Sequence, residues 1–222
     1  MVGLWVTGHP AKREAAIELH RRLSDAIRAQ EGSWSMSHSD LQRTSHTPWP
    51  IATYQSILLQ IIMAALLAKE RASADLSLRV QLDADDYYLL TTLVRSCREL
   101  GMFCYPNMVE QHSPAAPLAM IWVNVEEIKR FGFSLYKLCR VTSLVGSTES
   151  NAGMRTELLT VADLEYCMPD SDQFWDAPAV IDENERQQMI SQSNRREGMD
   201  PHGWVSYAAR VLCDAQVKFE WI

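Results

Sequence analysis

The sequence lacks the features that mark several special classes of protein. Its 222 residues contain five cysteines but no Cys-x-x-Cys pair, so a zinc module is not expected. Lysine and arginine number 21 against 28 acidic residues, which leaves no basic excess for the phosphates of duplex DNA. The longest apolar run, Ile57 to Ala68, is broken by Gln60 and is too short to span a bilayer. We therefore expect no direct binding of nucleic acid and no membrane span.

The cysteines also bear on the compartment. Their number is odd, and the apolar N-terminus is too short and lacks the basic start of a secretory signal. Unpaired thiols of this kind fit a reducing environment, so the expected location is intracellular, in the nucleus or the cytoplasm. Cys97 and Cys139 fall on apolar helix faces and are expected to be inert core thiols. The sequence shows no motif that calls for a metal or a cofactor, so none is expected.

The apolar residues that are present recur mainly at helical spacing. A first helix is predicted after Pro10, because proline suits the first helical position. Its expected inward stripe is Ala16, Leu19, Leu23 and Ile27. The polar stretch 31–47 has no apolar period and is predicted as a loop. Residues 51–71 are apolar nearly all round, which predicts a helix at the centre of the molecule.

The rest of the chain continues the helical pattern. Asp83 and Gly101 bound the best-defined helix, with Asp83 as its N-cap and Gly101 as its left-handed stop. Prolines in 102–117 predict a connecting loop, and 118–145 is predicted as a long helix. Two further helices are expected near 183–194 and 201–219. Strand signals are almost absent, so we predict an all-α fold: one domain over 1–222, an irregular multi-helix bundle with long loops.

The order of three stretches resembles one family, the fungal-specific transcription factor domain or middle homology region. The stretch Trp49 to Leu59 is similar to its aromatic-x-x-x-x-x-Gln-x-hydrophobic-Leu-Leu helix, and Leu93 to Met102 resembles its Arg-x-x-x-x-Leu-Gly-hydrophobic helix end. The third is Trp122 to Arg130 followed by Asp163-Leu164 and 168–177. In the family, the corresponding motif is a Trp, a Glu-x-x-Arg turn and then Leu-Pro-x-x-Asp-x-x-Trp. The resemblance covers about residues 10–180 and implies a helical regulatory domain.

The resemblance leads to one expectation about function and leaves a second open. No zinc module precedes the domain in this sequence, so it is expected to be a shortened, stand-alone copy. As a regulatory domain it would bind a small hydrophobic effector or a protein partner, with a homodimer as one option. The alternative is an enzyme recruited from that domain for natural-product biosynthesis. It would be a cofactor-free pericyclase of the Diels-Alder type, or a cyclase or isomerase, that holds one reactive conformer and donates a hydrogen bond.

One polar group of residues stands out as a candidate site. Glu127 and Arg130 lie within one helical turn, and Arg130 is placed to reach Asp170 or Asp172. The group is expected to brace a helix to a loop, because a buried guanidinium needs several acceptors. The alternative is an anion clamp facing a pocket. Glu126 and Arg130 are also expected to meet at i,i+4.

Single residues supply the remaining candidates. Catalytic candidates are Tyr54, Tyr105, His112 and Arg130, each able to donate a hydrogen bond. His112, with Glu110 nearby in sequence, is the candidate for moving a proton near neutral pH. Ligand-pocket candidates are Trp49, Trp122 and Trp175. The alternative interpretation of Trp122 and Trp175 is that they are core anchors, since each buries a large area.

Overall fold

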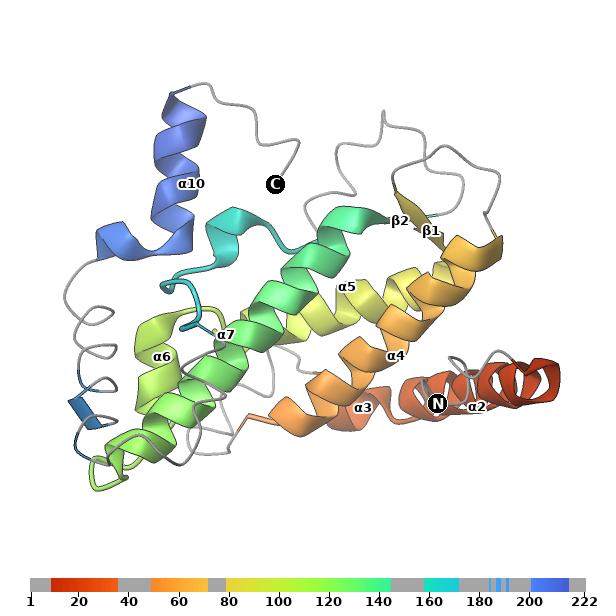
Figure 1. Ribbon diagram of the computed structural model, residues 1–222, viewed down its shortest axis with the longest axis horizontal. Helices are drawn as coiled ribbons and strands as arrows, with labels where there is room; N and C mark the ends of the chain where they lie inside the picture. The colour runs from red at the N-terminus through yellow and green to blue at the C-terminus, as the bar shows by residue number, and fades with distance from the viewer. Residues whose placement is uncertain are drawn as a thin grey trace. The chain divides into compact units, whose positions relative to one another are not determined.

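The computed structural model describes residues 9–35, 49–71, 79–144, 158–171 and 201–215, with the single positions 184, 187, 188 and 191. Of these residues 74% are helical and 5% lie in strands, which confirms the all-α prediction (Figure 1). By its internal contacts the chain divides into two compact units. Unit 1 is Met1–Glu99 with Lys137–Leu158, and unit 2 is Leu100–Tyr136 with Leu159–Ile222.

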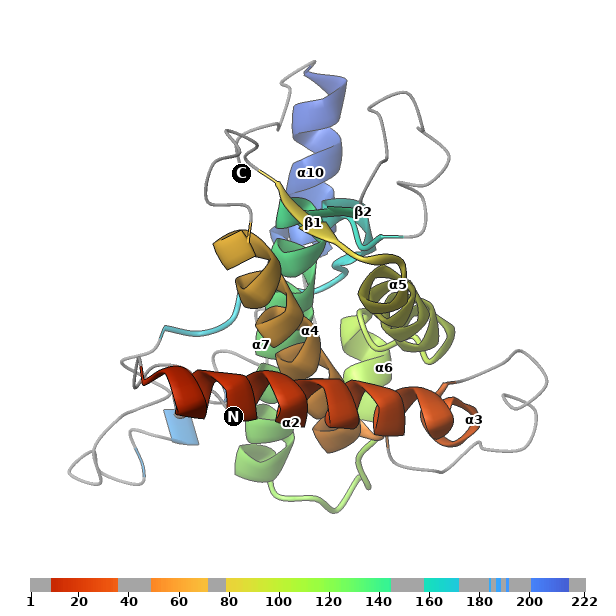
Figure 2. The same cartoon turned by 90° about the vertical axis from the view of Figure 1, so that its right-hand side faces the viewer.

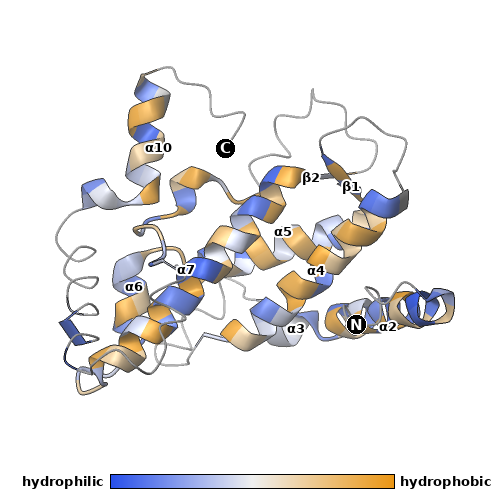
Figure 3. Cartoon of the chain, viewed as in Figure 1, coloured by the Kyte–Doolittle hydropathy of each residue, from blue (hydrophilic) through white to orange (hydrophobic). Residues whose placement is uncertain are grey.

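Unit 1 is built around one apolar helix. Its elements are α2 (Pro10–Ala29), α3 (Glu31–Trp34), α4 (Ile51–Arg71), β1 (Val80–Leu82), α5 (Ala84–Glu99) and β2 (Thr142–Leu144). Helix α4 packs against α2, α5 and β1, and α2 crosses it (Figure 2). Apolar residues run along most of α4, and Ile57, Ile61 and Met63 are almost fully buried (Figure 3). The predicted central helix is thus the core of this unit.

Two short strands add a feature that the sequence pattern did not indicate. β1 and β2 pair in parallel, with Val80 opposite Thr142 and Leu82 opposite Leu144. Parallel strands need a long crossover connection, and here the chain between them includes α5. Leu82 is buried, so the pair closes one side of the unit 1 core.

Helix α5 follows its predicted boundaries. The Asp83 carboxylate accepts the backbone N–H of Asp86 at 2.9 Å, which satisfies one of the free donors of the first turn. Asp85 and Asp86 add negative charge at the positive end of the helix. Gly101 has a φ of 66°, the left-handed conformation that ends helices. The predictions for Asp83 and Gly101 are confirmed.

The inward face of α2 differs from the predicted stripe. Ala16 is buried as expected, but Leu19 and Leu23 are 39% and 41% exposed. His20 and Ser24 are buried in their place. The helix is therefore rotated about its axis relative to the prediction. A hydrogen-bond partner on α4 makes the burial of the two polar residues favourable.

The expected loop 31–47 is only partly described. Its first residues, Glu31–Trp34, form the short helix α3 rather than a loop. The Trp34 indole N–H donates to the Ile27 carbonyl at 3.0 Å, which ties this turn to the end of α2. Residues 36–47 lie outside the described residues.

Unit 2 contains α6, the first part of α7 and the C-terminal segments from Leu159. Its elements are α6 (Tyr105–Glu110), α7 (Leu118–Val141) up to Tyr136, and the 3-10 turns η2 (Val161–Asp163) and η3 (Pro201–Gly203), followed by α10 (Val205–Asp214). Helix α10 packs on η2 and η3. Its Val205 and Ser206 N–H groups donate to the carbonyls of Tyr166 and Leu164. The helix predicted over 201–219 is confirmed for 205–214, but it begins at Val205 because 201–203 form the separate turn η3; most of 183–194 lies outside the described residues.

The predicted loop 102–117 contains the helix α6, which corrects that prediction. Pro106 lies in the first turn, where its missing N–H needs no partner, so it does not prevent the helix. Glu110 is the last residue of α6 rather than a loop residue. His112 lies in the turn after it, as expected.

Candidate functional site

A buried polar contact joins α2 to α4 in unit 1. The Gln60 amide nitrogen lies 2.6 Å from the carbonyl oxygen of His20, 2.5 Å from its Nδ1 and 3.1 Å from the Ser24 hydroxyl. A carbonyl can only accept, so the NH2 side of the amide faces α2. Nδ1 then accepts as well, which places the proton of a neutral His20 on Nε2. Gln60 thereby fixes the position of α2 on α4.

Beside this contact lies an open cleft of about 570 Å³. The face of α2 forms one wall, α4 forms the floor, and β1 with the first turn of α5 forms the opposite wall. The lining residues are Ile17, His20, Arg21, Ser24, Arg28, Ala64, Leu67, Ala68, Gln81, Leu82, Asp83, Asp85 and Asp86. The floor is apolar, whereas both walls carry charged groups at the rim.

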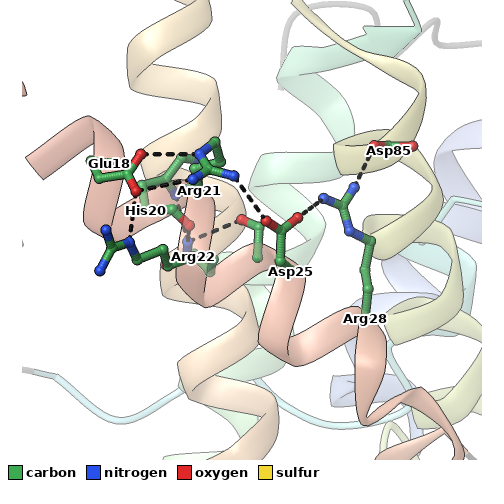
Figure 4. A network of polar contacts seen from close by, with 9 residues as sticks. Glu18, His20, Arg21, Arg22, Asp25, Arg28 and Asp85 are labelled. Atoms are coloured by element: carbon green, nitrogen blue, oxygen red, sulfur yellow. Dashed lines mark hydrogen bonds and ion pairs between the residues drawn. The ribbon is translucent and has the colours of Figure 1, made fainter.

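The charges on the α2 wall form a connected network (Figure 4). The Arg21 guanidinium donates two hydrogen bonds to Glu18, at 2.9 and 3.0 Å. It also reaches Asp25 at 3.3 Å. Arg28 pairs with Asp25 at 2.8 Å and, across to the other wall, with Asp85 at 2.5 Å. The Arg28–Asp85 ion pair is therefore a link between the two walls.

The arginines of this network keep Glu18 ionised. Hydrogen bonds from Arg21, and from Arg22 at 2.6 Å, lower the pKa of Glu18 to about 2. Glu18 is thus an anion at any physiological pH. Arg21 therefore always has a carboxylate partner on its own helix.

In unit 2, Trp122, Arg130 and Asp170, which were singled out from the sequence, form a compact brace with Glu126 and Lys129; its buried carboxylate is Glu126, whereas Glu127, the predicted partner of Arg130, is half-buried. The Glu126 carboxylate is fully buried and lies 2.5 Å from Lys129 Nζ, which is also buried. Its second oxygen accepts the backbone N–H of Asp170 at 2.8 Å. The pair is i,i+3 on α7, and Asp170 follows 44 residues later in sequence. Glu126 therefore holds the segment around Asp170 against α7.

Arg130 and Trp122 complete this brace. Arg130 donates to the Asp170 carbonyl at 2.7 Å, and the Trp122 indole N–H donates to the Asp170 carboxylate at 2.9 Å. Arg130 also lies 3.9 Å from Glu126, which confirms the predicted i,i+4 pair. Arg130 binds Asp170 as predicted, but its acceptor is the backbone carbonyl of Asp170 rather than the carboxylate. The burial of Lys129 was not predicted, because Lys129 lies in a turn rich in charged residues, which is typical of an exposed helix face.

The other predicted residues are found at separate places. Tyr54 is buried in unit 1, where its hydroxyl donates to the Trp34 carbonyl at 2.9 Å and burial raises its pKa. Tyr105 is buried at the start of α6, and its N–H donates to the Glu165 carbonyl. His112 is half-buried, with no hydrogen-bond partner for Nε2 among the described residues. Trp49 is half-buried just before α4.

Of the catalytic and pocket candidates, Trp122 and Arg130 come together, through Asp170. Trp175 and Asp172 lie outside the described residues. Of the candidates that the structure describes, none lines the cleft of unit 1. That cleft was missed because its walls come from segments far apart in sequence. The local signal that could have indicated the cleft is the pair His20 and Ser24, spaced i,i+4 on an amphipathic helix.

The cysteines and possible metal ligands add no second site. The described cysteines whose side chains can be placed, Cys97, Cys104, Cys139 and Cys167, are not joined in disulfides. Burial raises the pKa of Cys97 well above its usual value, as expected of an inert core thiol. Within the part of the chain that the structure describes, no three His, Cys, Asp or Glu side chains gather as a metal site would require.

Helix α4 is also long and apolar enough to cross a membrane. Its segment Ile51–Glu70 has a mean hydropathy of 1.8, and half of that window is buried inside the protein. The core helix of a globular protein meets the same criterion, so this is weak evidence for a membrane span.

Comparison with known proteins does not identify a function: no family model, no curated protein and no solved structure matches the chain.

Proposed function

We propose that this chain is a regulatory domain of the fungal transcription factor type, and that it binds a small effector in the cleft of unit 1. The observation that carries the proposal is the cleft itself, about 570 Å³ with an apolar floor of Ala64, Leu67 and Ala68. Ligand sites fall between about 300 and 1,000 Å³ and combine an apolar lining with a few polar groups. The cleft has this size and an apolar floor, although its walls carry more polar and charged side chains than such sites usually do.

The brace in unit 2 supports the family part of the proposal. Of the family's motif positions, Trp122 and Arg130 each donate to Asp170, which lies two residues before the motif's Asp172, and Arg130 lies 3.9 Å from Glu126, the neighbour of the motif's Glu127. A set of residues spaced over the sequence in this way has a physical reason to occur together. Their role is to fix the fold, which leaves ligand binding to another part of the chain.

The construction of the cleft suits a domain that responds to its ligand. One wall, α2, is fixed to α4 by the buried Gln60 contact, and it reaches α5 through the exposed ion pair Arg28–Asp85. An exposed ion pair contributes about 0–1 kcal/mol, so this link can open and close at little cost. A ligand that contacts both walls would favour the closed arrangement by mass action.

We keep the enzyme as the second candidate, because two guanidinium groups line the same cleft. Arg21 and Arg28 could donate hydrogen bonds to a polarised carbonyl of a substrate held on the apolar floor. A cofactor-free cyclisation or isomerisation needs little more than such a donor and a fixed conformer. In this version of the function the donors are the cleft arginines rather than Tyr54, Tyr105, His112 or Arg130.

A thermal-shift screen of small metabolites tests the proposal, with the full chain and two variants. Ala68→Trp fills the cleft, whereas Ala52→Trp places the same side chain at an exposed position of α4 outside it. A ligand at about 100 times its Kd stabilises the folded chain by about 2.7 kcal/mol. We expect hits that raise the Tm of the native chain and of Ala52→Trp but not of Ala68→Trp. Hits that Ala68→Trp retains, or no hits at all, would contradict the proposal.

The same hits separate the two candidates. Each is incubated with the protein and analysed by mass spectrometry and chromatography. An effector is recovered unchanged, and it alters reporter output when the chain is fused to a DNA-binding module. A substrate is converted to an isomer of the same mass, with turnover lost in Ala68→Trp.

A further inference from the structure

Two leucines of α2 are exposed on the side of that helix that faces away from the cleft. Leu19 and Leu23 are 39% and 41% exposed. Successive residues of a helix are turned by about 100°, so each side chain can be assigned to one flank of the buried His20. Ile17 and Arg21, which line the cleft, lie on one flank. Leu19 and Leu23 lie on the other.

Two leucines of α4 are exposed on the same side of the α2–α4 pair. Leu59 and Leu66 are 60% and 44% exposed. Ala64 and Ala68 line the cleft on one flank of Gln60, and the two leucines lie on its other flank. The helices pack together through Gln60 and share one cleft, so the flanks that face away from the cleft lie side by side. We call the four leucines the leucine surface. Exposed apolar side chains that adjoin in this way mark an interaction site.

The exposed stripe of α2 is nearly symmetric about its middle. In order along the helix it carries Lys12, Ala15, Leu19, Leu23 and Ala26, all of which are exposed. An antiparallel second copy of α2, centred between the two leucines, brings Leu19 of one copy opposite Leu23 of the other. The same arrangement brings Ala15 next to Ala26, and these small side chains allow the helix axes to approach. The stripe is therefore complementary to itself.

Charges beside the stripe favour the same antiparallel arrangement. Glu18 and Arg22 border the stripe, and their side chains are 43% and 72% exposed. In the antiparallel pair, Glu18 of each copy lies next to Arg22 of the other. In a parallel pair, Lys12 and Arg22 would instead each face their own copies. Charge complementarity across a contact sets its orientation more than its strength.

We propose that the leucine surface is the contact between two copies of this chain, which form a symmetric dimer with antiparallel α2 helices. Leu19 of one copy packs on Leu23 of the other, and Leu59 and Leu66 extend the contact beside them. A two-fold contact uses the same surface on both copies, so every substitution acts twice. The dimer does not depend on the proposed function, because the cleft lies on the opposite side of the α2–α4 pair.

The oligomeric state of the full chain tests the proposal, followed by sedimentation velocity at rising concentration. Because the contact is small, we expect a reversible dimer with a Kd in the micromolar range. Leu19→Glu brings a charge into the contact from both copies, so it should weaken the dimer by about tenfold or more. Leu118→Glu is the matched control: it makes the same change at a residue of unit 2 that is 56% exposed, and it should leave the Kd unchanged.

Two charge variants test the antiparallel orientation. Glu18→Arg leaves guanidiniums next to each other across the contact, and Arg22→Glu leaves carboxylates, so each variant alone should dimerise more weakly than the native chain. A mixture of the two variants restores opposite charges. The mixed dimer should exceed random pairing by about two- to five-fold, measured by native mass spectrometry with one variant isotope-labelled. Circular dichroism checks the fold of each variant, and the charge variants test the contact should Leu19→Glu not fold.

Three results would contradict the dimer. A chain that stays monomeric at about 1 mM would overturn the proposal. A dimer that Leu19→Glu leaves intact, or that Leu118→Glu weakens equally, would show that another surface makes the contact. Random pairing of the two charge variants would overturn the antiparallel arrangement. Each of these results leaves the metabolite screen, and with it the proposed function, unaffected.

Discussion

The polar contacts of α2 in unit 1 and of α7 in unit 2 use similar residues at similar helical spacings, but they differ in burial. On α2 the paired Arg21 and Glu18 side chains are 63% and 43% exposed. On α7 the paired Lys129 and Glu126 side chains are 2% and 0% exposed. The same i,i+3 spacing thus produces a solvated network in one unit and a buried brace in the other.

This difference in burial determines what each group of charges can do. A buried charge that loses its partner cannot be solvated by water, so the brace in unit 2 is costly to break and is suited to fixing a fold. Exposed pairs exchange partners for water at little cost, so the network in unit 1 can rearrange around a ligand. The comparison therefore supports a fold-stabilising role for the brace in unit 2 and is consistent with the proposed binding at the cleft of unit 1.

The largest expected effect comes from removing the buried acid. Glu126→Ala leaves Lys129 buried without its carboxylate and the Asp170 N–H without its acceptor. We expect the free energy of unfolding to fall by about 3–5 kcal/mol, measured by urea denaturation. Glu110→Ala, an exposed acid on α6, is the control and should cost less than about 0.5 kcal/mol. A loss under about 1 kcal/mol for Glu126→Ala would mean that the pair is solvated.

The second-largest effect is expected from the buried, uncharged contact between Gln60 and α2 in unit 1. Gln60→Ala removes the amide that contacts the His20 carbonyl and the Ser24 hydroxyl, both of which stay buried. Because the buried His20 and Ser24 groups lose the hydrogen bonds donated by the amide, we expect a loss of about 1–3 kcal/mol in unfolding free energy. Ser56→Ala on the exposed side of the same helix is the control. Equal effects of the two substitutions would show that α2 is not fixed through Gln60.

The third effect isolates one hydrogen bond of the brace. Trp122→Phe keeps an aromatic ring but removes the N–H that donates to the Asp170 carboxylate. Trp204→Phe is its control, because the Trp204 Nε1 has no hydrogen-bond partner among the described residues. We expect Trp122→Phe to cost about 1–2 kcal/mol more than the control in thermal or urea unfolding. Similar costs would indicate that only the lost ring area matters.

The smallest effect is the pH dependence of the exposed network. The folded pKa of Glu18 is about 2, below its ordinary value of 4.5. A lowered pKa stabilises the folded state at pH values above 4.5, and this contribution is lost as the pH falls toward 2. The native chain should therefore lose slightly more stability than Glu18→Gln between these pH values, when both are followed by circular dichroism. Parallel curves would show that the network adds nothing to stability.

The sequence predicted the elements whose signals are local. Asp83 and Gly101 mark the ends of α5 because a cap and a left-handed stop depend on residues within one turn of the helix. The Arg130 brace could be predicted in outline, since helical spacing places Glu126 beside it. Other local signals misled: prolines predicted a loop over 102–117 where α6 forms, and the polar stretch from residue 31 begins with the short helix α3.

Features that depend on distant partners could not be predicted. Periodicity placed Leu19 and Leu23 inside, but the structure buries His20 and Ser24, because Gln60 on another helix satisfies them. The cleft requires α2, α4, β1 and α5 to meet, and no pattern in any one segment indicates that meeting. Burial of Lys129 likewise depends on the fold rather than on its neighbours in sequence.

The most direct test of the division between binding and structure is to locate a bound ligand. Backbone amide shifts are recorded for the full chain with the best hit of the metabolite screen. We predict that the largest changes fall at 17–28, 64–68 and 81–86, with the amides of 122–130 and 166–170 nearly unmoved. Changes concentrated at 122–130 and 166–170 would contradict this account, because they would make the buried brace the binding site.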